Sequence, residues 1–365
     1  MNITARYANL LVHYCLEVKK GDRLFISSTS LAEPLVKEVY RAAYKAGAKL
    51  VEYDLAFDGR DKIFLEHGSN EALSTPPTLF KLAMEEYECY LNIRAPFNLR
   101  DKPGTNAERQ ELRTNTMAPI LKNYFERTAD RRLRRNLCQW PTEASAQEAG
   151  MSLAEYENFV FGACNLFEND PQGAWLQVRK DQQKIVDHLN KCTDFRYLNG
   201  ETDLKFSGKG RIWMNSDGQT NMPSGEVYTS PVEDSAQGKV HFSYPCIYQG
   251  NEVEGVTLWV KDGYVEKWEA TKGKDFLDQI FAMPGTRRFG EAAIGTNYKI
   301  QQMTKNILFD EKIGGTVHLA IGQSYLQTGG KNESSVHWDM ITDMTNGGEI
   351  WADEELIYKN GKFLI

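Results

Sequence analysis

The chain has 365 residues, more than the size of about 250–300 residues at which one hydrophobic core stops growing, so we expect two domains. Its 41% hydrophobic and 11% aromatic content suits a globular protein, and its formal charge of -7 disfavours nucleic acid as a partner. No run of about 18 apolar residues and no export signal occurs, and the six scattered cysteines suit a reducing compartment, so we expect a cytoplasmic protein without a membrane segment.

The first half of the chain alternates between helical and strand patterns. Apolar spacing predicts helices at 3–19, 31–47, 106–129 and 152–193, and strands at 22–28, 48–55, 87–93 and 134–140. The order strand, helix, strand predicts a parallel sheet with right-handed crossovers. We therefore expect an α/β N-terminal domain with a mainly parallel sheet over residues 1–193.

The pattern changes after Cys192, where short strands and turn dipeptides dominate. Strands are predicted within 202–208, 210–218, 238–245, 253–271, 314–322 and 333–341, and helices near 273–281 and 297–306. The pair Asp262-Gly263 is typical of a hairpin turn. We therefore expect a β-rich α+β C-terminal catalytic domain over residues 194–365.

The last third of the chain contains residue types that bind divalent metal ions. They are Glu226, Glu291, His318, His337 and Asp339. In the strand predicted at 333–341, His337 and Asp339 project from one face about 6.6 Å apart along the chain, which allows them to bind one ion or a pair. A lone histidine is more often structural than a ligand, but this pair and a second strand histidine favour a metal site. Two divalent ions can activate water and polarise a carbonyl, which points to a hydrolase.

Four segments resemble, in order and spacing, the signature blocks of one enzyme family. They are 221–231, 287–297, 315–325 and 334–340. The family is that of the two-metal aminopeptidases related to aminopeptidase T, the thermophilic-type leucyl aminopeptidases. The resemblance implies that the five residues named above are metal ligands and that Tyr325 stabilises the transition state. The chain departs from this family at Gly225, where relatives often carry a second acid, and in a shorter interval between His318 and His337.

The resemblance implies a metal-dependent aminopeptidase that uses a metal-activated water to hydrolyse the N-terminal residue from peptides with a free N-terminus. It also implies two divalent metal ions as cofactors, and a homodimer whose active sites face an enclosed cavity. The ions could be cobalt, zinc, magnesium or manganese, since the ligands that these metals prefer overlap.

Two alternatives remain open at this point. A mononuclear non-haem iron ring-cleaving dioxygenase, related in fold to these aminopeptidases, would use only His318, His337 and Asp339, so that Glu226 and Glu291 would be surplus. A non-catalytic peptide-binding protein would be expected to lack a metal ligand or the tyrosine, and none is missing. The motifs of serine hydrolases and P-loop nucleotide hydrolases do not occur.

Overall fold

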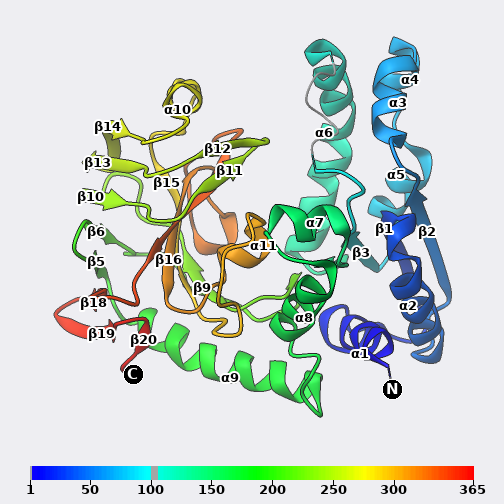
Figure 1. Cartoon of the computed structure of the whole chain (residues 1–365), viewed down its shortest axis with the longest axis horizontal. Helices are drawn as coiled ribbons and strands as arrows, with labels where there is room; N and C mark the ends of the chain where they lie inside the picture. Colours follow the sequence, from blue (N-terminus) through cyan, green and yellow to red (C-terminus); the bar gives the residue numbers. More distant parts are fainter. Residues whose placement is uncertain (1, 100–105) are drawn as a thin grey trace. The chain divides into compact units, whose positions relative to one another are not determined.

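The computed structural model describes residues 2–99 and 106–365, so Met1 and residues 100–105 of the predicted first domain lie outside the described residues. The chain forms two compact units (Figure 1). The first unit comprises Met1–Gln172 and Gly218–Pro223, and the second comprises Gly173–Asp217 and Ser224–Ile365. The sequence predicted a boundary between residues 193 and 194. The units divide earlier because helix α9 (Pro171–Leu189) buries Val186 and Leu189 in the core of the second unit.

The first unit has the predicted α/β architecture. Its strands are β1 (Arg23–Thr29), β2 (Leu50–Ala56), β3 (Cys89–Arg94), β4 (Arg134–Gln139) and β8 (Asn221–Met222). They form one sheet of order β2-β1-β3-β4-β8 in which every neighbouring pair is parallel. The predicted mainly parallel sheet is therefore confirmed.

Helices precede the first of these strands and occupy the connections between them. They are α1 (Ile3–Asn9), a π-helical turn (Leu10–Cys15), a 3-10 turn (Ser30–Ala32), α2 (Glu33–Lys45), α3 (Arg60–His67), α4 (Asn70–Leu73), α5 (Thr78–Glu86), α6 (Ala107–Ala129), α7 (Glu143–Glu148) and α8 (Leu153–Ala163). The amphipathic helix α2 joins β1 to β2 and buries Leu35, Val36 and Val39, which makes the predicted strand-helix-strand unit.

The second unit is rich in antiparallel strands, as predicted. An eight-stranded sheet has the order β14-β13-β10-β6-β5-β18-β19-β20, and a five-stranded sheet has the order β17-β16-β15-β9-β7. The strands are β5 (Asp194–Leu198), β6 (Asp203–Ser207), β7 (Met214–Ser216), β9 (Glu226–Thr229), β10 (Gln237–His241), β11 (Cys246–Tyr248), β12 (Asn251–Val253), β13 (Thr257–Lys261), β14 (Tyr264–Glu269), β15 (Phe289–Gly295), β16 (Thr316–Gly322), β17 (His337–Asp343), β18 (Glu349–Ala352), β19 (Glu355–Lys359) and β20 (Lys362–Phe363). β11 and β12 pair with each other.

Two short helices lie between strands of this unit, one after β14 and one after β15, and one helix prediction is wrong. The helices are α10 (Lys274–Phe281) and α11 (Ile307–Asp310). The hairpin turn at Asp262-Gly263 joins β13 to β14, with φ of +50° and +71° at its two residues. The helix expected at 297–306 is absent from the described chain, because side chains there bond to nearby backbone instead. Asn297 accepts a hydrogen bond from Lys299 N–H, and the buried Asp310 accepts one from Thr304 N–H.

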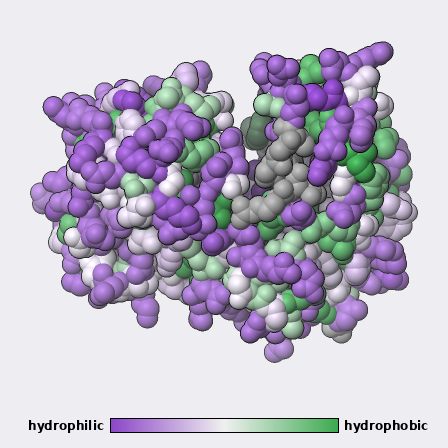
Figure 2. Space-filling model, turned by 45° about the horizontal axis from the view of Figure 1, so that its top comes forward, coloured by the Kyte–Doolittle hydropathy of each residue, from purple (hydrophilic) through white to green (hydrophobic). Residues whose placement is uncertain are grey.

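One face of the molecule is mainly polar. Hydrophilic residues cover most of the face shown in Figure 2, with smaller apolar patches between them. Among the described helices, none combines the length and apolar character needed to cross a membrane.

Candidate metal site

The predicted metal-binding residues lie on one face of the five-stranded sheet. Four neighbouring strands supply them: β9 carries Glu226, β15 carries Glu291, β16 carries His318, and β17 carries His337 and Asp339. The antiparallel register aligns Glu291 with Ala320, and Ala320 with Asp339, so a small alanine separates the two carboxylates. Trp338 points to the opposite face and packs in the core, as alternation along a strand requires.

The five side chains form two overlapping groups, each with possible ligand atoms within 4.8 Å of one another. The groups are Glu226–Glu291–His318 and Glu291–His337–Asp339. Nε2 of His318 lies 3.4 Å from Oε2 of Glu226 and 3.8 Å from Oε1 of Glu291. Nε2 of His337 lies 3.1 Å from Oε2 of Glu291 and 3.5 Å from Oδ1 of Asp339. Glu291 thus presents one oxygen to each group.

Two buried carboxylate oxygens in these groups lack hydrogen bonds among the described residues, which makes the groups suitable for binding metal ions. Within the described chain, Oε2 of Glu226 and Oδ1 of Asp339 are buried and have no hydrogen-bond partner. An unsatisfied buried acceptor costs about 1–3 kcal/mol, and coordination of a cation by these two oxygens would remove that cost. Carboxylate oxygens and imidazole nitrogens are also the donors that zinc, cobalt and manganese accept.

The pKa shifts of the two histidines also show that the carboxylates of the cluster favour positive charge beside them. Burial opposes the charged form of His318, but the nearby carboxylates Glu291 and Glu226 raise its pKa to about 9. The pKa of His337 is raised well above its usual value by Asp339 and Glu291, again against burial. The pKa of Asp339 is lowered to about 2, because the charge of His337 outweighs burial. Metal ions would displace the imidazole protons, so binding here releases protons.

Neighbouring groups orient His337 and place Tyr325 beside it. Nδ1 of His337 donates to the carbonyl oxygen of Gln323 at 2.7 Å, which leaves Nε2 directed at the carboxylates. Tyr325 precedes a 3-10 turn (Leu326–Thr328), and its ring centroid lies 4.9 Å from that of His337. Burial, with the charge of Glu291, raises the pKa of Tyr325 well above its usual value, so the phenol stays protonated at neutral pH and can donate.

Two charged residues that the sequence analysis did not single out adjoin the cluster. Glu311 and Lys312 lie in the turn between α11 and β16, and their side chains pair with each other. Nζ of Lys312 is fully buried and lies 3.6 Å from Oε1 of Glu226. Burial raises the pKa of Glu311 to about 8, although the charge of Lys312 opposes this. The only signal in the sequence was a short charged run shortly before His318, and nothing in that run indicated burial.

Steric crowding explains why glycine occupies position 225, where the related family often has a second acid. Its φ is +117°, and a Cβ added there would lie 2.8 Å from Cβ of Asn297. Asn297 is held in place, because its Nδ2 donates to the carbonyl oxygen of Ser224 at 2.9 Å. A side chain at position 225 does not fit this backbone, so Glu226 is the acid that this segment offers.

We expect Gly225→Ala to lower the free energy of unfolding by about 2–5 kcal/mol, since a left-handed non-glycine residue costs about 1–2 kcal/mol and overpacking adds about 1–3 kcal/mol. Gly250→Ala is the matched control, because Gly250 has φ +81° but no atom within 4 Å of an added Cβ. The free energy of unfolding of Gly250→Ala should fall only by the backbone cost of about 1–2 kcal/mol. Denaturant titration measures both variants, and equal losses would contradict the steric explanation.

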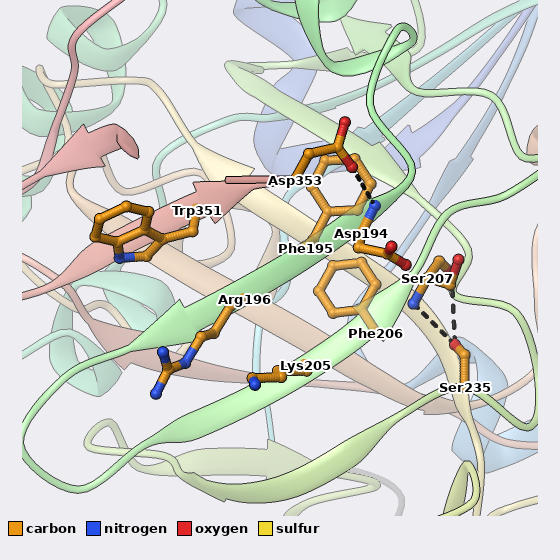
Figure 3. A pocket seen from close by; sticks show the side chains of 9 residues that line it. All are labelled: Asp194, Phe195, Arg196, Lys205, Phe206, Ser207, Ser235, Trp351 and Asp353. Atoms are coloured by element: carbon orange, nitrogen blue, oxygen red, sulfur yellow. Dashed lines mark hydrogen bonds between the residues drawn. The ribbon is translucent and has the colours of Figure 1, made fainter. Parts of the chain in front are cut away.

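A cavity elsewhere in the second unit shares no residue with this cluster. Its volume is about 560 Å³, and its lining includes Arg196, Lys205 and Trp351 (Figure 3). Asp353, another lining residue, accepts a hydrogen bond from the backbone N–H of Asp194 (Figure 3). Arg196 pairs with Asp203. These polar groups are engaged in local structure, so the chemistry of the chain points to the cluster on the five-stranded sheet.

Known proteins resemble this chain over nearly its whole length. The sequence model of the thermophilic metalloprotease family, M29, matches residues 2–363. Aminopeptidase 2 of Geobacillus stearothermophilus is 28% identical over 92% of this chain and 90% of its own length. Aminopeptidase AmpS of Bacillus subtilis is 26% identical over 98% of this chain and 97% of its own length. The structure of AmpT from Thermus thermophilus covers 100% of this chain with a TM-score of 0.86 at 21% identity, covers 99% of its own chain and has the same fold.

Proposed function

The chain belongs to the thermophilic metalloprotease family M29 and is a metal-dependent aminopeptidase, and we propose that the cluster on the five-stranded sheet is its active site. The resemblance predicted from four sequence segments is confirmed by the family match over residues 2–363. The substrates in this proposal are peptides with a free N-terminus, from which the N-terminal residue is hydrolysed.

The observation that carries the site assignment is the position of Glu291 between two groups of ligands. Its two oxygens face different histidines, at 3.1 Å for His337 and 3.8 Å for His318. A carboxylate in this position would offer one oxygen to each of two divalent ions, and each group adds one imidazole and one further carboxylate. We propose two ions, with Glu226, Glu291, His318, His337 and Asp339 as their ligands.

Divalent ions bound there supply the Lewis acidity that activates water and polarises a peptide carbonyl. The residues of the chain prepare the site for this reaction. The carbonyl oxygen of Gln323 keeps His337 turned toward the carboxylates. Tyr325 holds its proton and lies beside His337, where it can donate to the oxygen that becomes negatively charged in the transition state.

The dioxygenase alternative gains no support from these findings. An iron oxygenase needs open positions at a single metal ion for oxygen and substrate. Glu226 and Glu291 instead lie within 4.8 Å of His318 and crowd the metal position with additional carboxylates. The family match and the aminopeptidase names of the similar proteins agree with hydrolysis.

Chelation should abolish activity, and a blocked N-terminus should prevent cleavage. We expect dialysis against a chelator to eliminate hydrolysis of an aminoacyl p-nitroanilide and added Co²⁺ to restore it, because the ions are part of the catalytic site.

An N-acetylated peptide should resist cleavage while the free peptide shortens from its N-terminus, as mass spectrometry over time would record. Equal turnover of both peptides would refute exopeptidase action.

We also propose a cytoplasmic homodimer. The dimer is supported by the resemblance to the two-metal aminopeptidases. The cytoplasmic location is supported by the cysteines, all six of which lie in the described residues, where none forms a disulfide. Analytical ultracentrifugation should give twice the chain mass of 41.6 kDa, and a monomer mass at micromolar concentration would contradict the dimer.

A further inference from the structure

Lys312 is buried among the proposed metal ligands although an ammonium group cannot coordinate a cation. Its side chain is 0% exposed, and Nζ lies 3.6 Å from Oε1 of Glu226 and pairs with Oε1 of Glu311. Burial of an ammonium ion is costly unless anionic partners compensate for the lost water. The two carboxylates provide that compensation, so the lysine brings a fixed positive charge into the cluster.

The two groups of ligands differ in their relation to this charge. Lys312 lies within ion-pair distance of Glu226, which belongs only to the group with His318. In the other group, Asp339 pairs with His337 at 3.5 Å. Oε1 of Glu226 faces the ammonium, so Oε2, which lies 3.4 Å from His318, is the oxygen left to coordinate an ion.

We propose that Lys312 makes the two metal positions unequal, so that the Glu291–His337–Asp339 group binds its ion more tightly than the Glu226–Glu291–His318 group. This inference rests on the proposed function. The ammonium repels a cation beside Glu226, neutralises part of the charge of that carboxylate and occupies one of its oxygens. Lys312 is therefore a positioning residue, and the hydrolytic activity should follow the occupancy of the weaker position.

Titration of the metal-free full-length chain with Co²⁺ tests this inference. Equilibrium dialysis with metal analysis gives the number of ions and their dissociation constants, and the visible absorption of Co²⁺ reports each coordination step. For the wild-type chain we expect two ions whose dissociation constants differ by at least about tenfold, because a fixed charge acts strongly on a cation a few ångströms away in a poorly screened site.

Removal of the ammonium should bring the two affinities together. In Lys312→Met the second Co²⁺ should bind at least about tenfold more tightly, while the affinity for the first changes less, because Lys312 acts on Asp339 from beyond ion-pair distance. Lys312→Gln removes the charge but keeps a hydrogen-bond donor for the two carboxylates, so it gives the same test with less disturbance of the fold. Lys305→Met is the matched control, because Lys305 pairs with Glu252 and not with the cluster, and its two dissociation constants should equal those of the wild-type chain.

The outcomes separate this inference from the proposed function. A wild-type chain with two equal Co²⁺ affinities, or neutral variants whose second affinity is unchanged, would overturn the role of Lys312 and leave the two-metal site standing. If Lys312 only stabilised the fold, its neutral variants would have a changed melting temperature and an unchanged dissociation constant for the second Co²⁺. A wild-type chain that binds no Co²⁺ would overturn the proposed function itself.

Discussion

Glu291→Gln should remove both metal ions and lower kcat/KM for an aminoacyl p-nitroanilide by at least about 10³, or roughly 4 kcal/mol. Glu291 is the residue shared by the two groups of ligands, and one of its oxygens faces each histidine. An amide of the same shape has a single acceptor oxygen and no charge, so it cannot offer an acceptor oxygen to each group. Metal analysis after dialysis, together with steady-state kinetics, measures both effects.

Changes at the flanking carboxylates give a graded comparison. Asp339→Asn and Glu226→Gln each alter one group only, so each variant should keep the ion of the other group while losing activity. Glu349→Gln is a matched control on β18, where the carboxylate pairs with Lys359, and it should keep full metal content and activity. Retention of two ions by Glu291→Gln would contradict the proposal that Glu291 serves both groups.

Tyr325→Phe should keep both metal ions but lower kcat by about 10² to 10³, or roughly 2.7 to 4 kcal/mol, with little change in KM. A donor that acts on the charge developing in the transition state contributes to kcat and hardly to binding of the substrate. The structure fits this role, because the ring lies 4.9 Å from the ring of His337 and the pKa of the phenol is raised by burial and by nearby carboxylates, first among them Glu291.

Tyr264→Phe serves as the control for this variant. Tyr264 is 42% exposed at the start of β14 and contacts arginine side chains instead of the cluster, so loss of its hydroxyl should leave kcat unchanged. A Tyr325→Phe chain with full metal content and unchanged kcat would show that this tyrosine is a packing residue. The oxyanion would then be stabilised by the metal ions or by a backbone donor.

The local order of elements was accessible from the sequence because it depends on local patterns. The strand-helix-strand alternation predicted the parallel sheet of β1, β2 and β3, and the Asp262-Gly263 pair predicted the β13–β14 hairpin. The helix expected at 297–306 failed for an equally local reason. Polar side chains such as Asn297 and Thr304 have alternative hydrogen bonds with backbone groups, and apolar spacing does not reveal which set of bonds forms.

The sequence by itself determined the family and offered the candidate ligand types, since residue types and their order along the chain are written in it. Period-two alternation also put His337 and Asp339 on one face of a strand. Only the tertiary structure decided which groups meet. The pairing of β17, β16 and β15 brings Glu291 within 3.8 Å of His318 and 3.1 Å of His337, and the turn before β16 brings Lys312 to Glu226. Strand pairing and burial join residues far apart in the chain, and local spacing carries no record of such contacts.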